Sequence, residues 1–424
     1  MPAMEEGTPM TVLKAEAEPG EVGLDQARLQ RLDRRLARYV EEGKLPGWLL
    51  TVSRRGRLAH VSACGCRDAE AGLPVETDTL FRIYSMTKPV TSVAAMMLYE
   101  EGAFELTDPV SAFIPSFADA RVYAGGSDLR MLSVPATEQM RIWHLLTHTA
   151  GLTYGFHRNH PVDALYRSEG FEWGQPSGFD LAACCDTWAG IPLLFQPGAE
   201  WNYSVATDVL GRVVEVASGQ RLDEFFAERI FGPLGMTDTA FFVPEAERGR
   251  LAALYTPGPD GKAMLMAAMG RVASAPPRYL SGGGGLISTA ADYHRFTEML
   301  LARPGSPAGE LDGTALLGPR TVAYMTRNQL PGGADLEAFG RPLFAEAPMR
   351  GTGFGLGFAV VLDPAAGKTL TSQGEFSWGG AASTAFFVDP AEELTVGFFT
   401  QLLPSSTHPI RSQLRQLLYQ SLTG

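Results

Sequence analysis

The sequence contains few cysteines and no long apolar run, and each scarcity excludes a class of protein. The four cysteines are Cys64, Cys66, Cys184 and Cys185. Their spacings fit neither a zinc ribbon nor a common redox pair, so we expect reduced, structural thiols in a cytoplasmic protein. No stretch of about eighteen consecutive apolar residues occurs, which argues against a membrane-spanning helix and against a membrane partner.

Basic residues are also scarce. The chain has 35 Lys and Arg against 47 Asp and Glu, a formal net charge of -12. Phosphate binding needs a basic surface, so we expect no nucleic-acid partner. The first residues lack a basic start followed by an apolar run, which predicts a flexible tail over residues 1–22 instead of a secretory leader. No Gly-x-Ser-x-Gly motif occurs, which argues against an α/β-hydrolase.

The most informative stretch present is Ser85-Met86-Thr87-Lys88. Only five lysines occur, and Lys88 alone has a serine three residues before it. Apolar residues then recur at helical spacing up to Gly102, so both side chains should leave one face at the start of a buried helix. Lys88 would accept the serine proton if burial lowered its pKa. The alternative is an N-cap serine followed by a surface lysine.

Two further segments have both a structural and a catalytic interpretation. Tyr203 precedes a predicted buried helix. Its hydroxyl would relay protons there, or the residue would serve as an aromatic packing residue with a hydrogen-bonded hydroxyl. Trp378-Gly379-Gly380 stands at a strand edge. Such paired glycines indicate close approach of the backbone to a ligand or another strand, or an ordinary bulge.

Two further motifs suggest a metal site and a phosphate-binding loop, but a structural role explains each of them better. His144 and His148 lie four residues apart, but Leu145 occupies the position of a catalytic glutamate and Tyr154 that of a third histidine, so we expect structural histidines and no metal. The glycines of residues 281–285 lack the Gly-Lys-Ser/Thr of a phosphate-binding loop, and we expect them to allow close backbone packing.

The order of predicted elements indicates two units. Strands are expected at residues 48–53 and 58–63, and again at residues 355–362, 381–388 and 394–400. Helices and loops fill the middle of the chain. We therefore predict an α/β (α+β) fold with an antiparallel sheet flanked by helices, built from residues 23–104 and 286–424, and a mainly helical second domain inserted at residues 105–285.

Ser85-Met86-Thr87-Lys88, Tyr203-Ser204-Val205 and Trp378-Gly379-Gly380 resemble the three boxes of serine β-lactamases and penicillin-binding proteins. The closer resemblance is to family VIII carboxylesterases, whose pattern is similar to class C β-lactamases but has Trp-Gly-Gly where those have Lys-Thr-Gly. The resemblance covers roughly residues 24–420. It implies a β-lactamase/transpeptidase-like fold.

The resemblance also implies roles for residues. Ser85 would be the nucleophile, Lys88 and Tyr203 the pair that accepts and returns its proton, and the backbone N–H groups of Ser85 and Ala381 the oxyanion hole. Substrate would bind at Trp378, Gly379, Gly380 and Val205, with no cofactor or metal. Trp378 replaces a lysine that would bind a substrate carboxylate, which favours esters without one.

We therefore predict a serine carboxylesterase that hydrolyses short-chain acyl esters through an acyl-enzyme on Ser85, with weak β-lactam hydrolysis as a possible side activity. Its partner would be a small-molecule ester. Two alternatives stay open at this point: a β-lactamase or D-alanyl peptide hydrolase, and a sensor or binding protein that is acylated without turnover.

Overall fold

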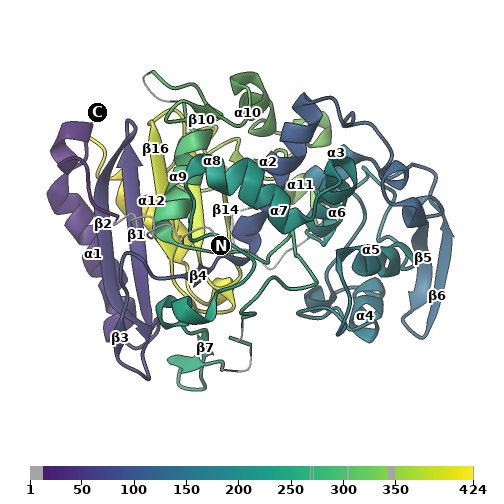
Figure 1. Ribbon diagram of the computed structural model, residues 1–424, viewed down its shortest axis with the longest axis horizontal. Helices are drawn as coiled ribbons and strands as arrows, with labels where there is room; N and C mark the ends of the chain where they lie inside the picture. The colour runs from purple at the N-terminus through teal and green to yellow at the C-terminus, as the bar shows by residue number, and fades with distance from the viewer. Residues whose placement is uncertain (1–12, 268, 271, 303–304, 342–348, 424) are drawn as a thin grey trace, which may run out of the picture.

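The two ends of the chain build one antiparallel sheet in the computed structural model, which describes residues 13–267, 269–270, 272–302, 305–341 and 349–423 (Figure 1). Eight strands follow the order β12-β13-β14-β15-β16-β1-β2-β3, and each neighbouring pair is antiparallel. Their bounds are β1 Gly47–Arg54, β2 Arg57–Asp68, β3 Leu73–Pro74, β12 Thr352–Phe354, β13 Ala359–Val361, β14 Phe376–Gly379, β15 Ala385–Asp389 and β16 Leu394–Phe399. The predicted sheet is confirmed.

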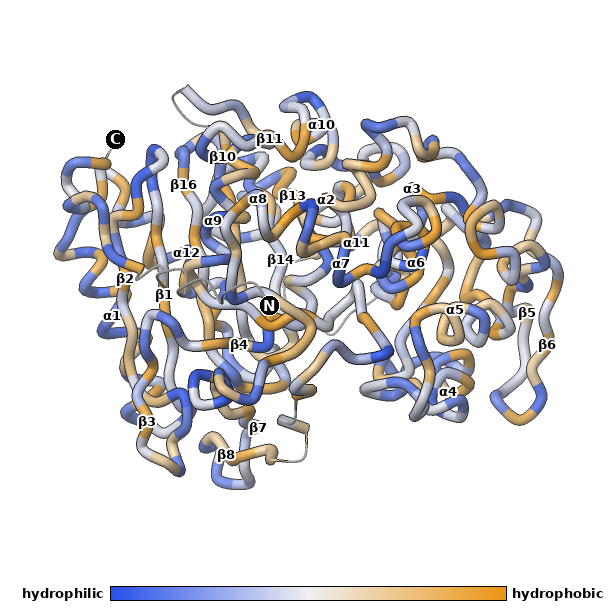
Figure 2. Tube along the Cα trace, in the orientation of Figure 1, coloured by the Kyte–Doolittle hydropathy of each residue, from blue (hydrophilic) through white to orange (hydrophobic). Residues whose placement is uncertain are grey.

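Helices cover both faces of this sheet because its central strands are apolar on both sides. Successive side chains of a strand point to opposite faces. Trp48 and Leu50 of β1 pack with helices α1 (Gln26–Glu41) and α12 (Ile410–Tyr419), while Leu49 between them joins the core under α9 (Ala290–Leu300). Hydrophilic and hydrophobic segments alternate along α1 in Figure 2, as expected of a helix with one buried face.

Helix α2 (Thr87–Glu100) connects the sheet to the helical part of the chain. All residues from Thr87 to Leu98 are buried, so only the C-terminal end of this helix, at Glu100, reaches solvent. It packs against α6 (Ala206–Ser218). The helix ends at the expected place, where Gly102 has a φ of 75° and donates its N–H to the carbonyl of Tyr99.

The middle of the chain is mainly helical, and its part from β5 to α6 lies to the right in Figure 1. Its helices are α3 Ile142–Leu146, α4 Pro161–Ser168, α5 Leu181–Ala189, α6, α7 Leu222–Phe226 and α8 Gly232–Leu234, with the hairpin β5 (Arg121–Ser127) and β6 (Arg130–Pro135) at the outer end. The remaining short elements are β4 Phe81–Arg82, β7 Tyr255–Pro257, β8 Ala263–Leu265, β9 Ile287–Ser288, β10 Glu310–Leu311, β11 Thr314–Ala315, α10 Pro319–Met325 and α11 Leu336–Phe339. Within the described residues, no helix is both long and apolar enough to cross a bilayer.

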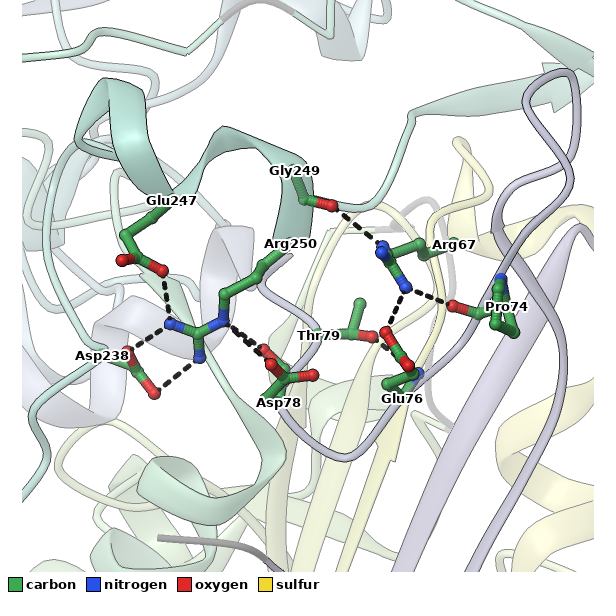
Figure 3. A network of polar contacts seen from close by, with 9 residues as sticks. All are labelled: Arg67, Pro74, Glu76, Asp78, Thr79, Asp238, Glu247, Gly249 and Arg250. Atoms are coloured by element: carbon green, nitrogen blue, oxygen red, sulfur yellow. Dashed lines mark hydrogen bonds and ion pairs between the residues drawn. The ribbon is translucent and has the colours of Figure 1, made fainter. Parts of the chain in front are cut away.

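Polar contacts fasten the segment at residues 238–250 to the sheet (Figure 3). Arg250 pairs with Asp238, Glu247 and Asp78, and its guanidinium is largely buried. Arg67 of β2 donates to the carbonyl of Gly249. Part of the segment between residues 105 and 285 thus contacts the sheet directly, and the division into two domains stays a prediction.

The predicted N-terminal tail falls partly outside the described residues, which begin at Leu13. From Leu13 onward the chain packs along β2. The side chain of Leu13 is buried, and the backbone N–H of Glu16 donates to the carbonyl of Leu58. Residues 13–22 therefore form a packed segment.

Two strand predictions near the C-terminus need correction. Of the strand expected at residues 355–362, only β13 (Ala359–Val361) forms, because residues 355–358 make the turn between β12 and β13, in which Gly357 has a φ of 97°. The strand expected from Ala381 begins at Ala385, since residues 380–384 form a turn in which Ser383 has a φ of 70°. Strand β14, which carries Trp378, was not predicted.

Candidate active site

Ser85 lies in a short turn that leads straight into α2. Residues Tyr84–Met86 form a 3-10 turn, and α2 begins at Thr87. Tyr84 has a φ of 44°, in the left-handed region that side chains other than glycine seldom adopt. Such a conformation costs roughly 1–2 kcal/mol, and it sets the direction of the backbone immediately before the serine.

Lys88 is almost completely buried and points at Ser85. Its side chain leaves the first turn of α2, and the residue is 1% exposed. The Nζ atom donates to Ser85 Oγ at 3.3 Å, to Tyr154 Oη at 2.9 Å and to the Gly283 carbonyl at 2.7 Å. The prediction that Ser85 and Lys88 share one helix face is confirmed, and the alternative of a surface lysine is excluded.

Tyr203 lies beside Lys88, in the loop that precedes α6 as predicted. Its ring centroid is 4.6 Å from Lys88 Nζ. Trp378 Nε1 donates to Tyr203 Oη over a long 3.4 Å, and His157 Nε2 donates to the Tyr203 carbonyl at 2.8 Å. Tyr203 is therefore held from two sides, next to the amine that contacts Ser85.

The two glycines after Trp378 allow the end of β14 to dock against the serine segment. A Cβ atom on Gly380 would lie 2.4 Å from the carbonyl oxygen of Ile83, two residues before Ser85. A Cβ atom on Gly379 would meet the guanidinium of Arg411 at 2.2 Å. The predicted close backbone approach is therefore confirmed at Gly380, whereas Gly379 makes room for the side chain of Arg411.

This docking brings Ala381 to the same cavity as Ser85. Both residues line it. In the part of the chain that the structure describes, the Ala381 N–H has no hydrogen-bond acceptor. An unpaired N–H at a cavity wall can bind an oxygen of an incoming molecule.

Asp208 fixes the loop that faces Lys88, and sequence reasoning did not identify it. Asp208 is 2% exposed, and its Oδ1 atom accepts from Tyr279 Oη, Ser281 Oγ and the Gly283 N–H at 3.0, 2.6 and 3.1 Å. The Gly283 carbonyl accepts from Lys88. The glycine-rich loop is thus clamped between a buried carboxylate and the lysine, which explains why Gly283 has no room for a side chain.

Tyr154 is the second tyrosine at Lys88, and it was also missed. Burial raises its pKa well above the ordinary value, and the nearby Tyr203, Asp208 and Tyr279 act in the same direction. Tyr154 therefore stays neutral, and its oxygen accepts a hydrogen bond from Lys88. Tyr154 lies two residues after Leu152 and belongs to no recognised motif, so the sequence alone does not identify it.

The two histidines that suggested a metal each have a structural partner. His144 Nδ1 accepts from the backbone N–H of Arg141, and His148 Nδ1 is 3.2 Å from Ser204 Oγ. Burial, followed by Arg141, lowers the pKa of His144 to about 4. Burial also lowers the pKa of His148 well below its usual value, with Lys88 and His157 adding to the effect. The prediction of structural histidines is confirmed.

A cavity of about 390 Å³ unites these groups, with mostly apolar walls. Six of the predicted site residues line it, namely Ser85, Tyr203, Val205, Trp378, Gly379 and Ala381. Lys88 reaches it through its contact with Ser85, and Gly380 lies between two lining residues. The predicted site residues therefore come together from three separate parts of the chain.

Comparison with known proteins identifies the family. The family profile described as Beta-lactamase matches residues 32–420. Esterase EstB of Burkholderia gladioli is 33% identical over 425 residues, covering 96% of this chain and 99% of that protein. Lovastatin esterase of Penicillium rubens is 29% identical over 386 residues, covering 86% of this chain and 91% of that protein.

A solved structure described as EstCE1, a hydrolase with promiscuous acyltransferase activity, superposes with a TM-score of 0.76 at 28% identity, covering 93% of this chain and 99% of that one. These similarities support a serine ester hydrolase. The chain therefore belongs to the beta-lactamase family, with the β-lactamase/transpeptidase-like fold and the likeness to family VIII carboxylesterases that its three motifs predicted.

Proposed function

We propose that the protein is a serine carboxylesterase that forms an acyl-enzyme on Ser85. The observation that carries this proposal is the contact of 3.3 Å between Ser85 Oγ and the Nζ atom of Lys88, a residue that is 1% exposed. When Lys88 is a neutral amine, two of its N–H bonds serve the Gly283 carbonyl and Tyr154 Oη. Its lone pair then faces Ser85 and accepts the hydroxyl proton as the oxygen attacks.

The negative charge that develops on the carbonyl oxygen is held by the backbone N–H groups of Ser85 and Ala381. Both residues line the cavity, and the docking of Gly380 against Ile83 fixes their separation. Loss of one such donor typically raises the barrier by roughly 2.7–4 kcal/mol. The strand edge therefore contributes to the rate about as much as the base does.

The Lys88–Tyr203 pair returns the proton to the leaving alcohol. We assign this role to Tyr203, whose ring centroid lies 4.6 Å from Lys88 Nζ, while the raised pKa of Tyr154 opposes proton loss from that residue. Breaking the C–O bond of the ester releases the alcohol and leaves the acyl group on Ser85 Oγ. Water, deprotonated by the same pair, then attacks the acyl carbon and restores the serine.

The substrate is a small ester without a carboxylate at the Trp378 side. Trp378 presents an indole where β-lactamases have a lysine ammonium, and its Nε1 is already committed to Tyr203. Phe354 packs edge-on against the same indole at 5.4 Å. This apolar wall favours a short acyl chain over a charged group.

Turnover of p-nitrophenyl butyrate and of nitrocefin by the purified protein tests the proposal. We expect many turnovers on the ester, few on the lactam, and none on either in Ser85→Ala. Many turnovers on the lactam alone would favour a β-lactamase. A single stoichiometric burst would favour a sensor, and ester turnover near wild type in Ser85→Ala would exclude Ser85 as the nucleophile.

A further inference from the structure

Three aromatic side chains form a stacked row that runs from Lys88 toward the mouth of the cavity. Tyr154 lies 4.6 Å from Phe156 with ring planes 19° apart, and Phe156 lies 4.7 Å from Trp173 with planes 11° apart. All three line the same cavity as Ser85. We call Tyr154, Phe156 and Trp173 the aromatic row.

The outer end of the row is open. Trp173 is 49% exposed, whereas the other five tryptophans are buried or half-buried. Its exposed ring stands at the wall of the cavity and not on a remote surface. Such a face, already aligned by stacking on Phe156, loses little freedom when a planar ring binds to it.

The charge beside the row is balanced. Glu172, next to Trp173, forms an ion pair with Arg158, so the mouth of the cavity presents no net charge at this point. A ring that binds there is therefore best uncharged, because a charged group would lose its hydration without gaining a dedicated partner.

The reaction geometry decides which arm of the ester follows the row. The alcohol oxygen must face the groups that return its proton, while the carbonyl oxygen faces Ser85 and Ala381. The first ring of the row is on the proton side, since Tyr154 Oη contacts Lys88 Nζ and its ring centroid is 5.4 Å from that of Tyr203. The alcohol arm thus leaves along the aromatic row.

We propose that the enzyme selects esters of arylmethyl-type alcohols, whose planar ring stacks on Phe156 and Trp173 while a short acyl group occupies the Trp378 side. This inference rests on the proposed esterase function and adds the substrate class. Trp173 is its specificity-determining residue.

The test compares benzyl butyrate with cyclohexylmethyl butyrate. Both are esters of primary alcohols with a six-membered ring of similar apolar area, so a difference in KM reports planarity and aromaticity. An aromatic pair typically gains 0.5–1.5 kcal/mol beyond burial, so we expect a KM roughly 2- to 12-fold lower for the benzyl ester. Trp173→Ala should abolish this ratio and Trp173→Phe should keep most of it.

A second pair assigns the arm, and a distant aromatic residue serves as the control. Ethyl phenylacetate and ethyl cyclohexylacetate carry the ring on the acyl side and should differ by less than the butyrate pair. Tyr324→Ala removes an exposed aromatic residue that does not line the cavity and should leave the ratio unchanged. Equal KM values for the butyrate pair, a ratio that survives Trp173→Ala, or a larger preference on the acyl side would overturn the inference. Absence of turnover with ethyl butyrate would instead overturn the proposed function.

Discussion

At the scale of single residues, the site places two tyrosines against one buried lysine, and their surroundings separate their roles. Tyr154 is half-buried at the cavity, and burial raises its pKa well above the usual range. Tyr203 is half-buried at the cavity, with its ring beneath Lys88 Nζ. Both tyrosines thus contact the lysine and face the cavity, and the raised pKa of Tyr154 opposes proton loss from that residue.

We expect Tyr203→Phe to lower kcat by at least roughly 100-fold, because general acid–base catalysis contributes about 10²–10⁴. Tyr154→Phe removes one acceptor from Lys88 and should cost about tenfold, the effect of a single hydrogen bond in a buried site. Steady-state kinetics of both variants on p-nitrophenyl butyrate provide the comparison. A larger loss in Tyr154→Phe than in Tyr203→Phe would assign the proton transfer to Tyr154.

The sequence alone predicts Ser85, Lys88 and Tyr203, because each belongs to a short motif. It does not predict Tyr154 or Asp208. These residues act on Lys88 and on the Gly283 loop across 66 and 75 positions of the chain, and contacts over such separations depend on the packing of whole helices. Neither residue has neighbours in the sequence that mark its function.

At the scale of elements, the site depends on how strand β14 meets the turn at Ser85. Gly380 is the point of contact, since its Cα approaches the Ile83 carbonyl and the Thr384 side chain. The same strand end presents Ala381 to the cavity. A shift of this strand therefore changes the distance between the two predicted oxyanion donors.

Gly380→Ala should lower kcat by about tenfold or more, because misplacing a catalytic group by about 1 Å can cost 10²-fold. The added Cβ would lie 2.4 Å from the Ile83 oxygen, so either β14 or the serine turn must move. Gly249→Ala is the matched control, since no atom lies within 4 Å of its added Cβ. If both variants retain wild-type kcat and the same unfolding midpoint, the proposed docking has no role in catalysis.

Strand β14 also shows where prediction of elements from the sequence reaches its limit. The long strands and amphipathic helices are evident from periodicity, as in α1 and β16. Strand β14 has four residues, and Trp378-Gly379 resembles a turn. It forms a strand because β13 and β15 pair with it on both sides, which is information that the local sequence lacks.

At the scale of the whole molecule, burial of neutral histidines links stability to pH. The pKa of His144 is lowered to about 4 by burial and then by Arg141. In the unfolded chain it is near 6.5. Protonation thus favours the unfolded state, so the contribution of His144 is complete above pH 6.5 and is lost as pH falls toward 4. Burial raises the pKa of Asp292 to about 6, so protonation of Asp292 favours the folded state. Its contribution to stability therefore grows as pH falls from about 6 toward the pKa of the unfolded chain.

The variant His144→Gln should reduce this loss. Glutamine at this position can still accept the Arg141 N–H that His144 Nδ1 accepts, but it does not titrate. Between pH 6.5 and 4.5 we expect the free energy of unfolding to fall by about 2–3 kcal/mol less in the variant than in wild type. Urea unfolding across this range gives the difference, and identical pH profiles would show that His144 does not titrate in this way.

The central claim is that Ser85 is the nucleophile beside a preformed site for negative charge. The most direct measurement is reaction of the native protein with p-nitrophenyl butylphosphonate, followed by intact and peptide mass spectrometry. We expect one butylphosphonyl group per chain, located on Ser85, with labelling absent in Ser85→Ala and much slower in Gly380→Ala. A label on any other residue, or equal labelling of Ser85→Ala, would contradict the account.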